Sequence, residues 1–131
     1  MGYLIDTNIA IHLRDGDESV NRRFEQHRGD VALSALSLAE LQRGLYKRPG
    51  QAGVRSPRLE SILRAIPVIP FDAAAAAAYG LIIAQCGWVK GRDFDRMIAA
   101  HAISTRSILV TNNAADFRDV PNLSLENWAT A

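Results

Sequence analysis

Short apolar runs alternate along the chain with longer segments of helical periodicity. Runs of three to five apolar residues are typical of buried strands, whereas apolar positions that recur every three or four residues are typical of helices. The pattern predicts strands at residues 3–5, 31–33, 68–71 and 107–110, and a short fifth strand around Leu123 and Leu125. It predicts helices at residues 8–14, 18–28, 57–66 and 94–105, one that opens at Ser37, and an Ala-rich one after Asp72.

Cap and turn residues predict where some of these elements begin. Ser37 followed by Glu40 three residues later is a capping-box pattern, which predicts that a helix opens at Ser37. Asp72 is predicted to cap the Ala-rich helix with its side chain. The segment 48–57 contains two prolines and two glycines, so we expect a turn or the tip of a helical hairpin there.

The order of the elements predicts an α/β fold. Strands of a parallel sheet are buried on both faces, so they read as continuous apolar runs, and helices form the connections between them. We therefore expect a short parallel β-sheet of four to five strands flanked by helices. No repeat or linker divides the 131 residues, and residues 1–131 are predicted to form a single domain.

Composition narrows the class of protein only a little. Hydrophobic residues make up 48% of the chain and the net charge is about +1, which neither requires nor excludes a nucleic-acid partner. Cys86 is the single cysteine, so an intrachain disulfide and a cysteine-based metal site are excluded. Asp6 interrupts the first apolar run, which argues against a signal peptide. The uncharged stretch 73–89 is short for a bilayer span. We expect a soluble, cytoplasmic protein without a membrane segment.

Four acidic residues occupy positions that a parallel α/β sheet would bring together. Asp6 and Asp116 follow predicted strands, and Glu40 and Asp95 lie near predicted helix starts. Ligands bind at the carboxyl ends of such strands. Carboxylates that converge there repel one another unless a cation is bound. Ligands that are all oxygen suit Mg²⁺ or Mn²⁺. The sequence therefore predicts an acidic metal site at this edge of the sheet.

Taken singly, each of these acids also has an ordinary structural explanation. Asp6 has the position of a helix cap, and Glu40 that of the second member of a capping box. Asp95 has the position of a first-turn acid, which the helix dipole favours. Asp116 lies in a polar segment that has the composition of a turn.

Five segments, in order, resemble PIN domains, and specifically the ribonuclease toxins of VapBC-type toxin–antitoxin pairs. The segments are LIDTN, SALSLAEL, DFDRMIAAHA, LVTNNAADF and VPNLSLENW. The resemblance covers nearly the whole chain. The first four segments carry the family's acidic positions, in order Asp6, Glu40, Asp95 and Asp116.

This resemblance implies a metal-dependent endoribonuclease. The four acids would be the catalytic and metal-binding residues for one or two Mg²⁺ or Mn²⁺ ions, and the products would carry 5′-phosphate and 3′-hydroxyl ends. Thr7, Thr111 and Asn113 would support the site by orienting ligands and water. Some relatives have an acid in place of Asn113, so a second ion would be held less tightly here. Asp93 is a further candidate supporting residue.

The substrate and the partners implied by the resemblance are macromolecules. RNA must approach an acidic site, so basic residues are expected around it; the candidates are Arg14, Arg43, Lys47 and Arg92. The resemblance further implies a homodimer, within a larger toxin–antitoxin assembly, and a VapB-type antitoxin. The tail of such an antitoxin would present an Arg to the acids.

Two other enzyme classes that use acids at strand ends fit the chain less well. Haloacid-type phosphatases place two acids around the end of the first strand, where this chain has only Asp6. Receiver domains use a Lys after a late strand, and the segment ILVTNN has none. A PIN fold without strong catalytic activity that serves as an RNA- or protein-binding module remains the main alternative, and Asn113, which adds no charge, favours it.

Overall fold

A five-stranded parallel sheet forms the centre of the molecule, for which a computed structural model describes residues 2–48, 50 and 52–129. The order of the strands across the sheet is β3-β2-β1-β4-β5, and all four strand pairs are parallel. The strands are β1 (Tyr3–Ile5), β2 (Val31–Ser34), β3 (Val68–Ile69), β4 (Ile108–Val110) and β5 (Leu125–Glu126). The predicted α/β fold and parallel sheet are confirmed.

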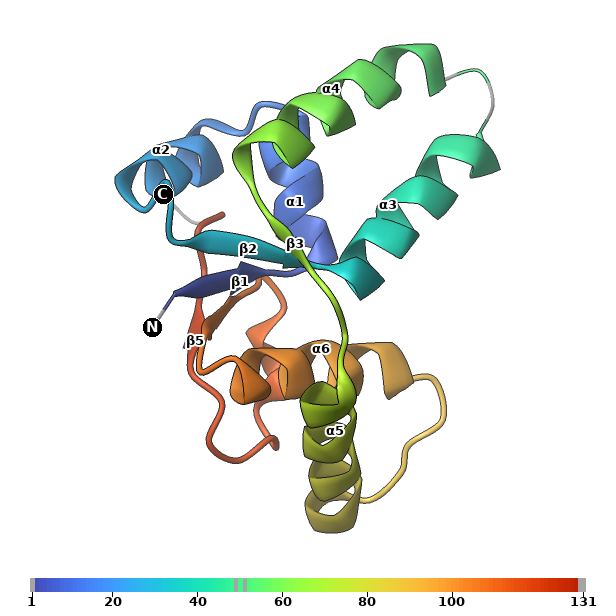
Figure 1. Ribbon diagram of the computed structural model, residues 1–131, viewed down its shortest axis with the longest axis vertical. Coiled ribbons are helices and arrows are strands. Elements are labelled where there is room, and N and C mark those ends of the chain that lie inside the picture. Colours follow the sequence, from blue (N-terminus) through green and yellow to red (C-terminus); the bar gives the residue numbers. More distant parts are fainter. Residues whose placement is uncertain (1, 49, 51, 130–131) are drawn as a thin grey trace.

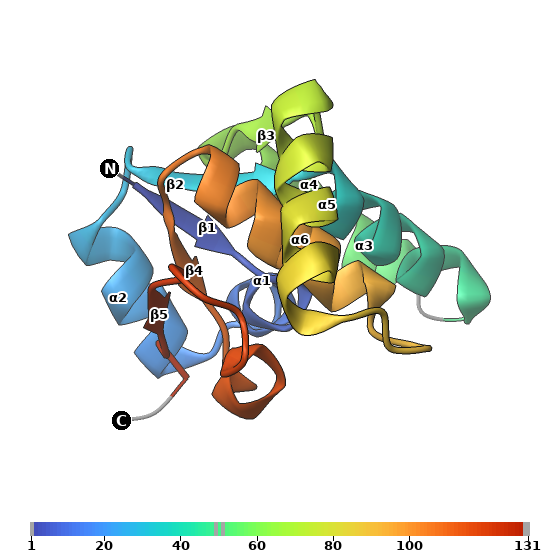
Figure 2. The same cartoon turned by 90° about the horizontal axis from the view of Figure 1, so that it is seen from below.

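Helices cover both faces of this sheet (Figures 1 and 2). They are α1 (Thr7–Arg14), α2 (Glu18–Gln26), α3 (Ala35–Lys47), α4 (Ala52–Ala65), α5 (Ala73–Cys86) and α6 (Asp93–Ser104). A short 3₁₀ helix, η2 (Ala114–Phe117), follows β4. Helices α1 to α4 lie on one face, and α5 and α6 lie on the other (Figure 1). In the described residues, no helix has both the length and the apolar character needed to cross a bilayer.

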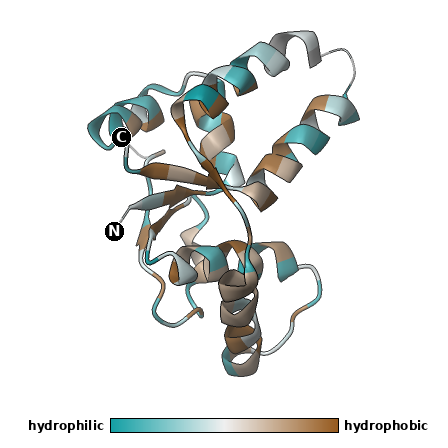
Figure 3. Ribbon diagram, viewed as in Figure 1, coloured by the Kyte–Doolittle hydropathy of each residue, from teal (hydrophilic) through white to brown (hydrophobic). Residues whose placement is uncertain are grey.

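The buried side chains divide between the two faces because successive residues of a strand point in opposite directions. In β1, Ile5 belongs to the core under α1 to α4, and Leu4 to the core under α5 and α6. In β4, Val110 and Leu109 divide in the same way. The strands are accordingly hydrophobic along much of their length, whereas hydrophilic residues are frequent on α2 and α4 (Figure 3).

Helix α3 begins earlier than the capping-box pattern predicted. Ser34, the last residue of β2, is its N-cap, and its hydroxyl accepts from the backbone N–H of Leu36 at 3.1 Å. Ser37 is instead buried inside the helix, and its Oγ has no hydrogen-bond partner among the described residues. The prediction was wrong because β2 turns directly into α3. Glu40 is therefore free of any capping role.

Other element boundaries also differ from the prediction, those of α4 and β3 among them. Helix α4 begins at Ala52, so it takes in part of the segment 48–57 that was predicted as a turn; residues 49 and 51 lie outside the described residues. Pro57 lies within the helix, where it removes one backbone donor. Strand β3 ends at Ile69 rather than residue 71, since Pro70 has no N–H for the ladder. Asp72 caps α5 as predicted and accepts from Ala75 N–H at 3.0 Å.

His101 connects the sheet to α6 from a fully enclosed position. The side chain is buried, its Nδ1 lies 2.8 Å from the Ser34 hydroxyl, and the ring also bonds to the carbonyl of Pro70. Phe71 packs edge-on against the ring. Burial lowers the pKa of His101 from its ordinary value of 6.5, although the charge of Asp72 and the Pro70 carbonyl oppose this shift. The imidazole is therefore a neutral structural group.

We expect this histidine to make the fold less stable in mild acid. The unfolded chain binds a proton at His101 near pH 6.5 and the folded chain only at lower pH, so its contribution is complete above pH 6.5 and is lost as pH falls below it. The slope reaches at most about 1.4 kcal/mol per pH unit. Urea unfolding between about pH 7.5 and 5.5 should show a loss that is absent in His101→Gln. Equal slopes in both proteins would contradict this.

Candidate active site

The carboxyl ends of β1 and β4 mark the edge of the sheet where a ligand can bind. Strands β2 and β3 extend the sheet on one side of β1, and β4 and β5 extend it on the other. The chain thus changes the direction of sheet growth between β1 and β4. In open parallel sheets a crevice forms at such a point, outside the carboxyl ends of the strands. Asp6 follows β1 directly, and Thr111 follows β4.

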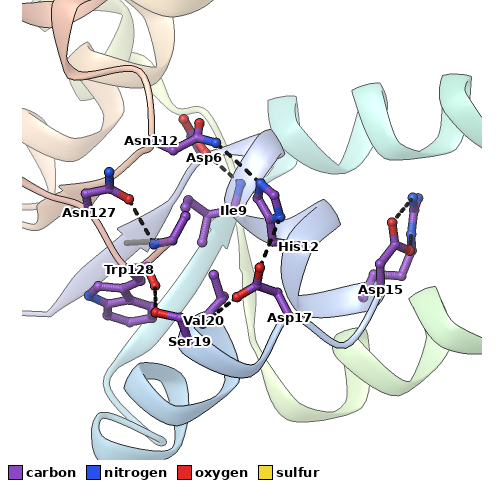
Figure 4. Close-up of polar contacts among 12 residues, drawn as sticks. Asp6, Ile9, His12, Asp15, Asp17, Ser19, Val20, Asn112, Asn127 and Trp128 are labelled. Atoms are coloured by element: carbon purple, nitrogen blue, oxygen red, sulfur yellow. Dashed lines mark hydrogen bonds and ion pairs between the residues drawn. The ribbon is translucent and has the colours of Figure 1, made fainter. Parts of the chain in front are cut away.

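Asp6 is both a helix cap and a cavity residue. Its Oδ1 accepts from the backbone N–H of Ile9 at 2.9 Å, which fixes the start of α1 (Figure 4). The hydroxyl of Thr111 also donates to its carboxylate. Asn112 approaches the same helix, with its Nδ2 at 3.3 Å from His12 Nε2 (Figure 4). The capping explanation for Asp6 is thus correct, and it is compatible with a place in the site.

Glu40 is held toward the site by Thr7, the first residue of α1. The Thr7 hydroxyl donates to Glu40 Oε1 at 2.5 Å, and Arg43 donates to Oε2 at 3.3 Å. One oxygen therefore contacts the start of α1, and the other contacts the next turn of α3. Thr7 and Glu40 are 33 residues apart in the chain, so this bond brings the segments LIDTN and SALSLAEL together at the site.

Asp95 and Asp116 approach from the other side of the crevice. Asp95 lies in the first turn of α6, and Asp116 lies in η2. Arg92, the N-cap residue of α6, donates from Nη1 to the backbone oxygen of Asp116 at 3.3 Å, which joins the two segments. Asn113 precedes η2, and its backbone N–H donates to the Thr111 hydroxyl at 3.0 Å. Helix α6 and the segment after β4 thus place two acids opposite Asp6 and Glu40.

These side chains line one cavity of about 270 Å³. The four predicted acids line it, namely Asp6, Glu40, Asp95 and Asp116. The rest of the lining consists of the polar residues Thr7, Asn8 and Asn113 and of Gly91, Phe94, Ile98 and Phe117. The structure therefore brings together all four acids predicted from sequence and two of the predicted supporting residues. Thr111 does not line the cavity, but it is fully buried and bonds to Asp6.

Burial and mutual repulsion raise the pKa of two of the acids. For Asp6, burial is the main cause, the bonds from Thr111 and Ile9 oppose it, and the charges of Asp95 and Glu40 add to it. For Asp95, burial is again the main cause, followed by the charge of Asp116, with Arg92 opposing. Negative charges from four segments of the chain are therefore close enough to destabilise one another.

The donor set of this cavity fits a divalent cation with hard oxygen ligands. Four carboxylates with hydroxyl and amide oxygens beside them suit Mg²⁺ or Mn²⁺. A cation would also relieve the repulsion that raises the pKa of Asp6 and Asp95. As the side chains stand, no group of three or more His, Cys, Asp or Glu residues in the described part of the chain has the arrangement of a metal site.

Asp93 and Arg14, both candidates from sequence, make their contacts outside the cavity. Asp93 accepts from the Tyr79 hydroxyl at 2.5 Å and from the Trp88 indole at 3.0 Å, so it holds the loop before α6. Arg14 has a side chain only 4% exposed, paired with Asp15 at 3.0 Å. The structure therefore gives no support for Arg14 as an RNA contact, because its guanidinium is enclosed. The sequence of α1 alone did not show which of its faces is exposed.

Sequence reasoning missed the pair that joins the two acidic segments. Arg96, next to Asp95, makes two bonds to Asp119, at 2.9 and 2.7 Å, and Asp119 lies three residues after Asp116. The Arg96 side chain is 3% exposed. An arginine beside an acid on an apolar helix was the only signal available, and it did not identify the partner. Asn8, which lines the cavity, had a signal in its position directly after Asp6 and Thr7.

A parallel sheet with acids gathered at its carboxyl edge is the arrangement of a PIN domain, and the PIN domain family model matches residues 3–123. The chain is 35% identical over 134 residues to Ribonuclease VapC2 of Rickettsia felis, an alignment that covers 98% of each chain. It is 37% identical over 132 residues to the tRNA(fMet)-specific endonuclease VapC of Shigella flexneri, covering 97% of this chain and 98% of the relative. The chain belongs to the VapC family of PIN-domain proteins.

A solved structure agrees with this assignment. The crystal structure of VapBC2 from Rickettsia felis bound to a DNA fragment from their promoter contains a chain that is 34% identical. It superimposes with a TM-score of 0.86 over 98% of this chain and 99% of that chain. The family resemblance found in the sequence is confirmed.

Proposed function

We propose that this protein is a metal-dependent endoribonuclease that acts as the toxin of a toxin–antitoxin pair. The observation that carries the proposal is the convergence of Asp6, Glu40, Asp95 and Asp116 on one cavity at the carboxyl edge of the sheet. The names of its relatives, Ribonuclease VapC2 and tRNA(fMet)-specific endonuclease VapC, support the same activity. A protein that only binds RNA has no need for four carboxylates at the place where a negatively charged phosphate must come.

In this proposal the four acids hold one or two Mg²⁺ or Mn²⁺ ions, directly or through water. A bound divalent cation supplies positive charge for the phosphate oxygens and acidifies water. Thr7 keeps Glu40 turned toward the cavity through its 2.5 Å bond, and Thr111 does the same for Asp6. Asn113 lines the cavity beside Asp116, where its amide can orient water without adding charge.

The proposed reaction is hydrolysis of an RNA phosphodiester. The oxygen of a water attacks the phosphorus, a carboxylate of the cavity accepts its proton, and the bond from phosphorus to the 3′ oxygen breaks. The 3′ oxygen takes a proton and leaves as a hydroxyl, and the phosphate remains on the 5′ end of the other fragment. The apolar side chains of Phe94, Ile98 and Phe117 line part of the same cavity.

Basic side chains at the rim would guide RNA to this acidic cavity. Arg43 is exposed beside Glu40, and Lys47 lies one helical turn further along α3. Arg92 lies across the cavity, where it bonds to Asp116. We propose that these three residues contact phosphates of the RNA, with single-stranded segments as the targets because their backbone is free to bend into a cavity.

Two protein partners complete the proposal. One is a VapB-type antitoxin, since the similar Rickettsia felis chain was solved as VapBC2. Its tail would place an arginine among the four acids, where a positive charge replaces that of the metal ion. The other is a second copy of this chain, in a homodimer within the toxin–antitoxin assembly. The proposal places the protein and its RNA substrate in the cytoplasm.

Removal of divalent metal is expected to abolish cleavage. The protein, purified free of antitoxin, would be incubated with labelled total RNA and with tRNA(fMet), which is named as the target of the Shigella flexneri relative. We expect discrete fragments with 5′-phosphate ends in Mg²⁺ or Mn²⁺ and none in EDTA, with activity restored when excess Mg²⁺ is added back. Fragments that persist in EDTA would contradict a role for metal ions.

The alternative is a PIN fold that binds RNA or protein without cutting it. Asn113 favours it, because this side chain adds no charge to the cavity. Absence of cleavage across both RNA samples, together with metal binding measured by calorimetry, would support this alternative. Folding must be verified in the same preparation, since an unfolded protein would show the same lack of cleavage.

A further inference from the structure

The loop that joins α5 to α6, residues 87–92, exposes a large aromatic side chain. Trp88 is 61% exposed and its neighbour Val89 is 44% exposed. This loop lies at one side of the molecule, where it returns from the end of α5 to the start of α6 (Figures 1 and 2). Two adjacent apolar side chains in water are not needed for the α/β core, which is closed by other residues.

Trp88 is exposed but not free to turn. Its indole N–H donates to both carboxylate oxygens of Asp93, at 3.0 and 3.3 Å, and the Tyr79 hydroxyl donates to the same carboxylate at 2.5 Å. The edge of the ring is thus tied to α6, and α5 supports the tie through Tyr79. A side chain fixed in this way loses little conformational entropy when another group packs on it. This explains what Asp93 does in place of lining the cavity.

The loop connects Trp88 directly to the candidate active site. The N–H of Arg92 donates to the carbonyl of Val89 at 3.1 Å, which closes a turn of residues 89–92. Gly91 is the third residue of this turn and has a positive φ of 85°, which that position of the turn favours. Gly91 itself lines the cavity. Trp88 precedes Gly91 by three residues, so their Cα atoms are at most about 11 Å apart. The loop that carries Trp88 therefore borders the cavity.

We propose that Trp88 is a positioning residue that stacks on an unpaired base of the RNA, beside the phosphate that is cut. This rests on the proposed ribonuclease function. Lys90 and Arg92 lie on the same loop, where cations suit the phosphates on either side of a stacked base. Aromatic stacking accepts any base, so Trp88 favours single-stranded RNA over paired RNA without reading its sequence. A peptide partner would not need the cations of this loop.

The kinetic test compares Trp88→Ala and Trp88→Phe with the wild type on an RNA that the wild type cuts. Loss of one stacking contact is expected to raise KM about tenfold in Trp88→Ala, with little change in kcat, and Trp88→Phe should recover most of it. An RNA with an abasic nucleotide next to the cut should show the same rise with the wild type, and no further rise with Trp88→Ala. Leu81→Ala, an exposed apolar residue of α5, serves as the control.

A second measurement does not depend on cleavage. The chain has two tryptophans, and Trp128 is 0% exposed, so fluorescence that changes on addition of RNA reports Trp88. A short single-stranded RNA of mixed sequence should quench this signal, and Trp88→Phe should abolish the change. Quenching without cleavage would refute the nuclease and support the base contact. Cleavage with unchanged KM in Trp88→Ala and unchanged fluorescence would refute the base contact alone.

A protein partner is the competing occupant of this loop. If Trp88→Ala weakens binding of the antitoxin, measured by calorimetry, but leaves RNA cleavage and its KM unchanged, Trp88 belongs to a protein interface and the proposal is overturned. Binding of no RNA by any variant overturns it as well, together with the proposed function. Thermal melting of both variants verifies folding, which an exposed side chain should disturb little.

Discussion

Asp95→Asn is expected to lower kcat/KM for RNA cleavage at least about a hundredfold while leaving the fold at least as stable as that of the wild type. The asparagine keeps the size of the side chain but removes a carboxylate from the cavity, so the affinity for the cation and the placement of the phosphate both suffer. The fold gains because burial and the charge of Asp116 raise the pKa of Asp95. A carboxylate with a raised pKa destabilises the folded state at neutral pH, and its removal relieves this.

Opposite changes in activity and stability distinguish an active-site acid from a structural one. Asp6→Asn should behave in the same way, since burial and repulsion also raise the pKa of Asp6 and asparagine is a good helix cap. Glu18→Gln is the matched control, because Glu18 is also a first-turn acid and lies outside the cavity on α2. Cleavage rates and urea unfolding would be measured for all three variants. Full activity in Asp95→Asn would show that the acid cluster is not a catalytic site.

The acids were predictable as a set and not one by one. Glu40 shows the reason: its sequence context with Ser37 is a capping box, and only the structure assigns the cap to Ser34. Asp6 shows that the two explanations are compatible, since one side chain both caps α1 and lines the cavity. Local sequence rules describe contacts within a few residues. Agreement of four separate segments with one family pattern was the stronger evidence.

The parts that sequence reasoning missed are contacts between distant segments. Arg14 was a candidate RNA contact from sequence, but its side chain is only 4% exposed and is paired with Asp15, and the sequence does not specify which helices meet. Asp93 was a candidate supporting residue from sequence, but its carboxylate turns to Tyr79 and Trp88. A helix turns about 100° per residue, so residues two apart face different neighbours. Side-chain direction decides their roles.

Arg96 and Asp119 illustrate a further kind of contact, one that braces the site without entering it. Arg96 follows Asp95 directly, and Asp119 lies three residues after Asp116. Their paired bonds at 2.9 and 2.7 Å therefore join the two segments that deliver half of the acids. Repulsion between Asp95 and Asp116 acts to separate these segments. The ion pair opposes that separation close to where it arises.

Asp119→Ala is accordingly expected to lower the free energy of unfolding by about 1–2 kcal/mol at neutral pH. The variant leaves the guanidinium of Arg96 buried without its partner, and Arg96 Nε already has none among the described residues. Breaking a fully buried pair costs about 3–5 kcal/mol, but the Asp119 side chain is 56% exposed and solvent weakens the interaction. Urea unfolding at neutral pH measures the difference.

The Glu25–Arg28 pair supplies the control, since both of its side chains are more than half exposed. Glu25→Ala should cost much less than Asp119→Ala, because water screens a pair that is fully accessible to it. The bond from Arg96 lowers the pKa of Asp119 below its ordinary value of 3.8, so the contribution of the pair is complete above pH 3.8 and is lost as pH falls through the folded pKa. The wild type should therefore lose its advantage over Asp119→Ala in strong acid. An equal advantage at neutral and acid pH would mean that Asp119 acts through packing and not through its charge.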